Sequence, residues 1–270
     1  MIGQRCVQQQ IKGAIENNDL ARFSILVGDI GSGRKTLAKE IAKWVGAECV
    51  IVDKGVDAVR DVIVQSYKMS EPVLYVLDND GMSQAAKSAL LKVTEEPPNK
   101  AMFVLTVTDL SQTLDTLTSR ARIYRMDGYT PEDIAQFAGT EDRRFTNFCT
   151  NKYEVDLLKS YGIDNFADFI ALVVDNIDEV SGANALKMEN RLSFAADDGK
   201  YDIKIFLQAF RTECVSRMLE VKDVDEKLKY IEWVNITTNT LSKLKISSLN
   251  RQSLLDMWIF DIRGVQNADS

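Results

Sequence analysis

The hydrophobic pattern of the first 127 residues alternates between apolar runs and amphipathic stretches. Short, largely apolar runs predict buried strands at residues 23–27, 48–52, 73–77 and 101–107, and residues 122–125 are predicted as a last strand. Helical spacing lies between them, at residues 7–17, 36–45, 57–66 and 82–95. Apolar strands joined by helices are typical of a parallel sheet covered on both faces. We therefore predict an α/β domain over residues 1–127.

Beyond residue 126 the strand pattern gives way to helices. Thr130, Pro131 and Asp133 predict a helix start, with threonine as cap and proline in the first turn. Short helices follow, broken at glycines 139, 162 and 182. Residues 201–263 carry three long helical patterns whose apolar stripes, such as those around Phe206 and Trp258, predict core or subunit contacts. We predict a small helical lid at residues 128–195 and an all-helical domain at residues 196–270.

Composition narrows the classes of function. With 45% hydrophobic and 27% charged residues, the chain has the balance of an ordinary globular protein. It shows no signal-like segment and no apolar run near the ~20 residues that span a bilayer, so we expect a cytoplasmic protein without membrane contact. A net charge of −7 argues against tight, autonomous binding of nucleic acid. The absence of histidine excludes histidine catalysis, and the four separated cysteines predict no metal site.

The stretch GDIGSGRKT, residues 28–36, has the elements of a phosphate-binding loop in an altered register. Such a loop needs glycines so that backbone N–H groups wrap a phosphate, then lysine for the terminal phosphates and a hydroxyl for magnesium. Gly28 and Gly33 keep the required separation, and Gly31 lies between them. Arg34 occupies the place of the lysine and Lys35 the place of the hydroxyl, so Thr36 arrives one position late.

This register changes the chemistry that the loop can support. Consecutive residues at the start of a helix point about 100° apart, so Lys35 and Thr36 cannot replace their neighbours without a local shift. The planar fork of Arg34 also suits open oxygen surfaces better than a tight phosphate cradle. The loop therefore predicts weak, metal-poor nucleotide binding and inefficient hydrolysis.

The acidic partner of such a loop is expected where a buried strand ends. Asp78 directly follows the apolar run 73–77, which fits a residue that orients magnesium. Asn79 follows it where a glutamate would activate water, and a neutral amide cannot accept that proton. We expect the side chain of Asp80 to point elsewhere; alternatively, both aspartates only mark a strand–helix turn.

Residues 74–126 resemble the AAA+ clamp-loader family. The family's acidic turn, its ALLKTLEEPP helix and its serine–arginine motif correspond here to residues 78–81, to residues 89–98 (ALLKVTEEPP) and to Ser119-Arg120. The opening residues 2–28 also resemble the helix before the family's phosphate loop, and the C-terminal helices fit a collar-like domain more loosely. The resemblance implies an AAA+ P-loop NTPase-like sheet domain, a helical lid and a helical collar.

The resemblance also implies roles for three further residues. Arg120 matches an arginine finger that reaches into a neighbouring subunit's ATP site; alternatively it is a surface arginine. Thr108 matches the polar sensor-one position of the degenerate nucleotide site. Arg60 matches a helix that faces DNA, and equally it can be an exposed charge paired with Asp57 one turn back.

Several departures from the family's ATPase pattern occur together. In addition to the altered loop and Asn79, Ala183 stands where the sensor-two arginine is expected, and the zinc-binding cysteine cluster of many bacterial members is missing. This combination resembles the delta-prime type of subunit, which does not hydrolyse ATP and stimulates its neighbour. The altered site then either holds no nucleotide or holds ATP or ADP without efficient hydrolysis.

The main hypothesis is thus a delta-prime-like subunit of a DNA polymerase III holoenzyme. Its implied partners are other clamp-loader subunits in a hetero-oligomeric ring, a sliding clamp, and primed DNA through the complex. One alternative is an active AAA+ motor that uses Lys35 and Thr36 in a shifted loop with Asp80 as substitute acid. Another is an AAA+-derived adaptor that only bridges partner proteins.

Overall fold

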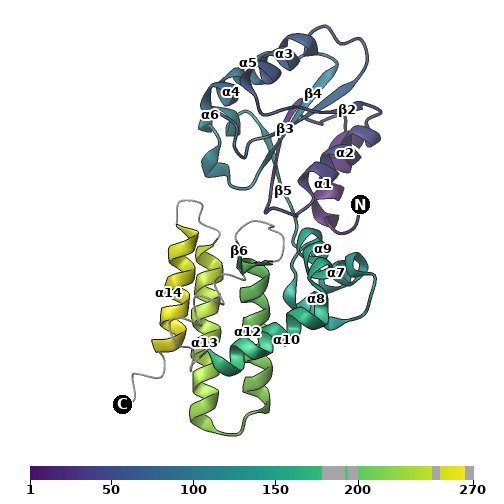
Figure 1. Ribbon diagram of the computed structural model, residues 1–270. Helices are drawn as coiled ribbons and strands as arrows, with labels where there is room; N and C mark the ends of the chain where they lie inside the picture. Colours follow the sequence, from purple (N-terminus) through teal and green to yellow (C-terminus); the bar gives the residue numbers. More distant parts are fainter. Residues whose placement is uncertain (178–191, 194–199, 245–249, 265–270) are drawn as a thin grey trace. The chain divides into compact units, whose positions relative to one another are not determined.

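The computed structural model describes residues 1–177, 192–193, 200–244 and 250–264. The chain divides into two compact units, Met1–Asp133 and Ile134–Ser270 (Figure 1), which are described separately below. The division into three domains, at residues 1–127, 128–195 and 196–270, stays a prediction.

The first unit is built on a five-stranded parallel sheet with the order β2-β3-β4-β1-β5. All five predicted strands are present: β1 (Phe23–Val27), β2 (Glu48–Ile51), β3 (Val73–Asp78), β4 (Ala101–Val107) and β5 (Arg122–Arg125). The central strands β1 and β4 are buried along their whole length, whereas the edge strands β2 and β5 are partly exposed. Burial on both faces explains their continuous apolar sequences.

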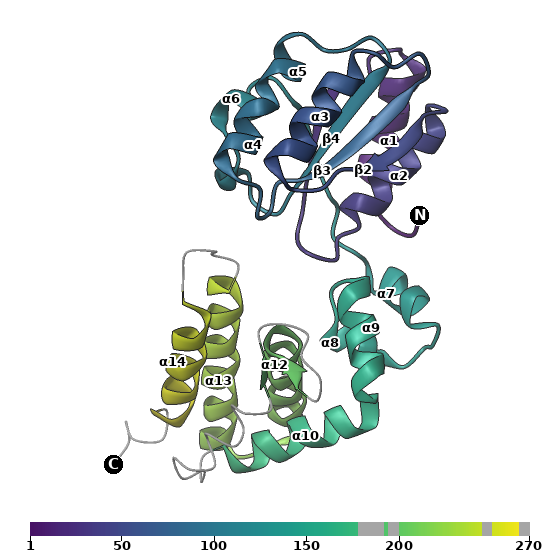
Figure 2. The same ribbon diagram turned by 45° about the horizontal axis from the view of Figure 1, so that its top comes forward.

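Helices cover both faces of this sheet, as Figure 2 shows. One face carries α1 (Arg5–Glu16) and α2 (Arg34–Trp44), and the other carries α3 (Val56–Ser66), α4 (Gln84–Ala89), α5 (Leu91–Glu95) and α6 (Asp115–Thr118). Successive strand residues enter opposite cores: Leu26 packs with Leu37 of α2, while Ile25 belongs to the cluster that includes Val59 of α3. The period of two along the strands therefore divides the core into two layers.

The helix predicted at residues 82–95 is two helices in the structure. Helix α4 begins after Ser83, whose hydroxyl accepts a hydrogen bond from Ala86 N–H at 3.2 Å, while Met82 is buried in the core. Leu90 separates α4 from α5, and its N–H donates to the Lys87 carbonyl three residues back. This hydrogen bond spans three residues, as in a 3₁₀ helix, instead of the four of an α-helix. It explains why the helix is interrupted at Leu90, which the hydrophobic periodicity did not reveal.

The helix start predicted around Thr130 is confirmed in α7 (Pro131–Ala138). The Thr130 hydroxyl accepts from Asp133 N–H at 3.3 Å, and the Asp133 carboxylate accepts from Thr130 N–H at 3.0 Å. This reciprocal pair is a capping box in which aspartate replaces the usual glutamate. The short helices that follow are α8 (Arg143–Phe148), α9 (Lys152–Tyr161) and α10 (Ile163–Asn176), the last two separated by Gly162 with φ 76°.

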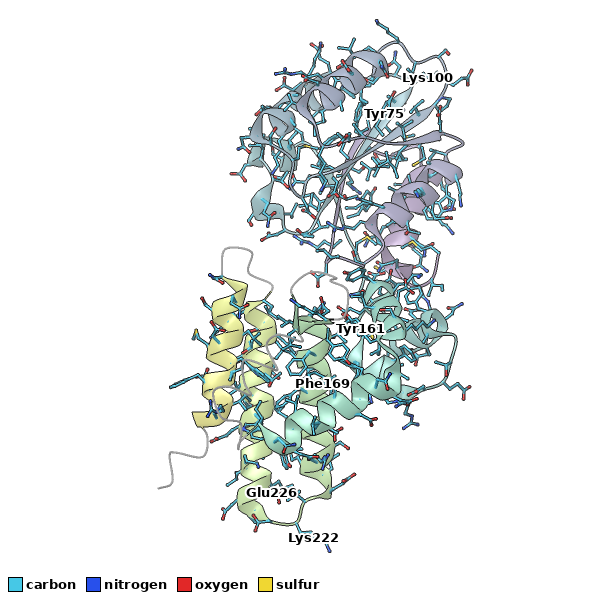
Figure 3. The ribbon with its side chains drawn as sticks, viewed as in Figure 1. Tyr75, Lys100, Tyr161, Phe169, Lys222 and Glu226 are labelled. Atoms are coloured by element: carbon cyan, nitrogen blue, oxygen red, sulfur yellow. The ribbon has the colours of Figure 1, made fainter. Side chains whose placement is uncertain are left out.

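The second unit also contains the three predicted long helices, α12 (Ile203–Glu220), α13 (Val224–Lys243) and α14 (Arg251–Gly264). They lie side by side in Figure 1 and enclose an aromatic core of Phe206, Phe210, Trp233 and Trp258. Two further rings, Tyr161 and Phe169, are labelled in Figure 3. Tyr161 contacts Phe166 of α10, and Phe169 of α10 contacts Tyr201, which precedes α12. The apolar stripes are therefore core, as one of the two interpretations predicted.

A short parallel pair, β6 (Leu192–Ser193) and β7 (Tyr201–Asp202), precedes α12 and has no counterpart in the sequence prediction. Each strand has two residues, too few for a hydrophobic period to appear. Within the described helices, no segment is both long and apolar enough to cross a membrane.

Candidate functional site

The glycine-rich loop connects β1 to α2, as predicted. Gly31 and Gly33 have φ of 85° and 87°, a left-handed conformation that favours glycine. Gly28 is needed for a different reason, because a Cβ atom there would lie 2.7 Å from Met126 and from the Ser32 hydroxyl. The loop is therefore a tight strand–turn–helix connection at the carboxyl edge of the sheet, where open α/β sheets bind their ligands.

Two residues distant in sequence hold this loop. The Ser32 carbonyl accepts hydrogen bonds from Gln4 Nε2 at 3.1 Å and from the Tyr129 hydroxyl at 2.9 Å. Gln4 Oε1 in turn accepts from Asp127 N–H, so Gln4 joins the N-terminus to the segment after β5. Sequence reasoning missed both side chains, because neither belongs to a motif near the glycines.

The sheet brings the predicted acidic and polar residues to the same edge. Asp78 ends β3 and pairs in register with Thr106 of β4, and Thr108 follows two residues later. Because β4 lies between β3 and β1, the ends of these strands meet beside the glycine loop. The structure therefore brings Asp78, Thr108 and the loop together.

Asp80 also lies in this site, contrary to the expectation that its side chain would point elsewhere. Its Oδ2 is 3.2 Å from Arg34 Nη1, and its Oδ1 accepts from Thr108 N–H at 3.2 Å and from the Thr108 hydroxyl at 3.0 Å. The side chain of Arg34 is only 11% exposed. The turn at Gly81, with φ 83°, follows Asp80 directly, and strand alternation does not extend across such a turn.

Asp78 is paired with two lysines. Its Oδ2 lies 2.9 Å from Lys35 Nζ and 3.4 Å from Lys54 Nζ. Burial raises the pKa of Asp78, but the hydrogen bond and charge of Lys35, the charge of Lys54 and the Asp80 N–H together outweigh it and leave the pKa below its ordinary value. Asp78 is thus a carboxylate at neutral pH. Lys54, which follows β2, was not predicted, and no motif indicates it.

The residues of this site do not fit the magnesium ion that a P-loop fold implies. Lys35 stands where the metal-binding hydroxyl is needed, and Thr36 is exposed on α2. Oδ2 of Asp78 already contacts two ammonium groups. Within the ranges that the structure describes, no group of three His, Cys, Asp or Glu side chains is arranged to hold a metal.

Asn79 is buried, with only 1% of its surface exposed. Its Nδ2 donates to the Gln112 carbonyl at 3.4 Å, and Lys87 Nζ donates to the same oxygen at 2.5 Å. The side chain is thus directed toward residues 110–113, which include a short 3₁₀ helix (η1, Leu110–Gln112). The residue in the place of a water-activating glutamate is neutral and held by groups outside the phosphate loop.

The two remaining candidate residues contact other parts of the first unit. Arg120 follows α6, is 41% exposed, donates to the Thr116 carbonyl at 2.9 Å and lies 3.5 Å from Glu95 of α5. Arg60 lies 3.8 Å from Asp57, which is the helix pair that its alternative interpretation predicted. A role for Arg120 in trans and a DNA contact for Arg60 stay predictions. Ala183, in the expected sensor-two position, lies outside the described residues.

Together the loop after β1, the carboxylate after β3 and the polar residue after β4 define an α/β domain of the AAA+ P-loop class. Residues 49–130 match the family model described as DNA polymerase III, delta subunit. The chain is similar to proteins of the AAA+ clamp-loader family. This confirms the resemblance found in residues 74–126.

Curated relatives are replication proteins. DNA polymerase III subunit gamma of Buchnera aphidicola (subsp. Schizaphis graminum) is 26% identical over 169 residues, 51% of this chain and 47% of the relative. The replication factor C small subunit of Natronomonas pharaonis is 26% identical over 165 residues, which are 54% of this chain and 50% of the relative. DNA polymerase III subunit delta' of Escherichia coli K12 is 39% identical over 77 residues, which are 26% of this chain and 22% of the relative. The chain spans about half the length of the first two relatives.

Two solved structures from Thermotoga maritima are also similar. A DNA polymerase III gamma-subunit-related protein aligns at 14% identity and a TM-score of 0.47, covering 98% of this chain and all of that one. The RuvB Holliday junction branch migration motor aligns at 17% identity and a TM-score of 0.49, covering 95% and 82%.

Proposed function

We propose that this chain is a delta-prime-like clamp-loader subunit in DNA replication, and that it does not hydrolyse ATP efficiently by itself. The observation that carries the proposal is the position of Asn79: it replaces the expected general base and contacts Gln112 instead of the phosphate loop. The fixed pairs of Lys35 with Asp78 and of Arg34 with Asp80 support the same conclusion, since they occupy groups that a metal–nucleotide complex would need.

We propose further that Arg120 completes the ATP site of a neighbouring subunit. Its guanidinium is exposed enough to reach another molecule, while the Thr116 carbonyl and Glu95 limit its orientations. An arginine that offsets developing phosphoryl charge in trans raises turnover strongly in related enzymes. The partners in this proposal are an ATPase subunit of the same loader, a sliding clamp and primed DNA.

The helices of the second unit offer surfaces for joining such a ring. Leu219 on α12, Leu228 on α13 and Phe260 on α14 are 72%, 53% and 77% exposed, although most apolar side chains of these helices are buried. Contiguous exposed apolar surface favours contact with another protein, and Leu219 and Leu228 lie on the neighbouring helices α12 and α13. This supports assembly through the C-terminal helices.

The test first identifies the proteins that co-purify with the full chain and then measures ATP turnover of the reconstituted complex. Replacing Arg120 by alanine should lower the turnover of the complex by about tenfold or more while leaving assembly intact. The matched control is Arg122→Ala, which removes an exposed arginine two residues away on β5. Unchanged turnover in the Arg120→Ala complex would refute the role in trans.

A second candidate function is an active motor, and one observation favours it: Asp80 lies in the site and could serve as a substitute acid. Against it, Asp80 is occupied by Arg34 and Thr108, and Thr36 is exposed. Turnover by the isolated chain, abolished by Asp80→Asn, would favour the motor. The adaptor hypothesis predicts co-purifying proteins whose ATP turnover does not depend on Arg120.

A further inference from the structure

Lys87 of α4 is a buried lysine whose ammonium group contacts a neutral acceptor. Only 8% of the residue is exposed, and Nζ donates to the Gln112 carbonyl at 2.5 Å. Among the residues that the structure describes, no carboxylate lies within ion-pair distance of this ammonium group. Burying an ammonium group costs free energy that one hydrogen bond to a neutral carbonyl does not offset. We therefore expect Lys87 to lower the stability of the first unit.

Two buried side chains converge on the same carbonyl oxygen. Asn79, which follows β3, donates to the Gln112 carbonyl at 3.4 Å, and Lys87 reaches it from α4. The side-chain oxygens of Asn79 and Thr113 are buried and have no hydrogen-bond partner within the described part of the chain. Buried polar groups of this kind cost stability and indicate a functional constraint. The cluster is therefore better explained by what it holds than by its contribution to folding.

Gln112 lies near the start of a hydrogen-bonded segment that ends at Arg120. The N–H groups of residues 112, 113, 117, 118, 119 and 120 donate to carbonyls three or four residues back, at 2.9–3.2 Å. The segment contains both the 3₁₀ helix η1 and helix α6. Because these hydrogen bonds leave few free torsions in the backbone, we expect residues 109–120 to move largely as one body.

Apolar contacts attach this segment to the domain, and hydrogen bonds orient it. Leu117 of α6 is fully buried, and Leu110 and Leu114 pack against the same core. Such apolar contacts are non-directional. The two hydrogen bonds to the Gln112 carbonyl are directional. They therefore restrict the angle at which the segment, and with it Arg120, lies on the domain.

We propose that Lys87 is a positioning residue for Arg120: it holds residues 109–120 in the orientation that presents the guanidinium to a neighbouring subunit. The inference rests on the proposed role of Arg120 in trans. Lys87 is buried, so it acts through the Gln112 carbonyl and not on a partner directly. Its ammonium group costs stability while it supports the orientation of the segment. Removing it should therefore change stability and turnover in different directions.

The test replaces Lys87 by methionine in the full chain, alone and in the complex with the proteins that co-purify with it. Methionine is unbranched and apolar, so it fills the buried space without a donor. We expect the urea midpoint of the chain to stay the same or to rise. In the complex, kcat for ATP should fall about tenfold with KM unchanged, because misplacing a reacting group by about 1 Å costs up to about 100-fold. The control Lys68→Met removes an exposed lysine of the same unit and should change neither quantity.

A double-mutant cycle with Arg120→Ala separates positioning from a structural role. If Lys87 acts through Arg120, adding Lys87→Met to Arg120→Ala should lower turnover no further. A lower urea midpoint for Lys87→Met, an unchanged kcat, or the same loss of kcat in the Arg120→Ala background would each overturn the inference. If Arg120→Ala lowers turnover and Lys87→Met does not, only the inference fails. Unchanged turnover in the Arg120→Ala complex refutes the role in trans, and the inference with it.

Discussion

Replacing Asp80 by asparagine should lower the free energy of unfolding of the first unit by about 2 kcal/mol. Asparagine keeps one oxygen, which can still accept from the Thr108 N–H and hydroxyl. It places an N–H₂ group where Asp80 Oδ2 now lies 3.2 Å from Arg34. The substitution therefore removes an ion pair and brings two hydrogen-bond donors together.

The magnitude follows from the burial of this pair. The side chains of Arg34 and Asp80 are 11% and 27% exposed. Exposed ion pairs contribute about 0.2–1 kcal/mol, whereas breaking a fully buried pair costs about 3–5 kcal/mol. An intermediate value of about 2 kcal/mol corresponds to a fall in Tm of about 8 °C for a unit of this size, at about 4 °C per kcal/mol.

Asp57→Asn is the matched control, because it makes the same chemical change in the same unit. Asp57 is 96% exposed and lies 3.8 Å from Arg60, so its loss should cost at most about 0.5 kcal/mol. Hydrogen exchange of the amides of β4, which is buried throughout, reports unfolding of the first unit for each variant. If the two variants differ by less than about 0.5 kcal/mol, the Arg34–Asp80 pair does not contribute as its geometry indicates.

Two further predictions concern the second unit. Thr237→Val should lower the stability of this unit by about 2 kcal/mol in urea unfolding, because the Thr237 hydroxyl accepts a hydrogen bond of 3.0 Å from the buried Trp258 indole N–H. Thr238→Val, at an exposed neighbouring position, is the control. Equal losses of stability in the two variants would contradict the prediction. Burial raises the pKa of Asp202, whose carboxylate caps Ile205 N–H, so ionised Asp202 destabilises the fold at neutral pH. Asp202→Asn keeps the cap and should be at least as stable as the wild type at pH 7. As the pH falls through the folded pKa toward the unfolded value of about 3.9, the stability of the wild type should rise relative to that of the variant. Urea midpoints that move in the opposite direction across this range would refute the assignment.

The sequence by itself determined the elements and their class. The strand pattern located all five strands of the sheet, and the burial of β1, β3 and β4 on both faces follows from their lack of polar alternation. The spacing of Gly28, Gly31 and Gly33 predicted the tight loop, since two of these glycines have positive φ and the third has no room for a Cβ atom. The strands and the two glycines with positive φ depend on local conformation, which neighbouring residues largely fix, whereas the close contact at Gly28 involves the distant Met126.

Only the tertiary structure decided which charges meet at the loop. Lys54 follows β2, whereas Asp78 and Asp80 lie at the end of β3, and they come together because parallel strands end at one edge of the sheet. The direction of Asn79 likewise depends on Gln112, 33 residues further along the chain. A hydrophobic period specifies which face of an element is buried, but it carries no information on which polar side chains of distant segments will pair. The shifted glycine loop, with Arg34 and Lys35, indicated an altered phosphate site, and the fold added Lys54 and decided which carboxylate each cation contacts.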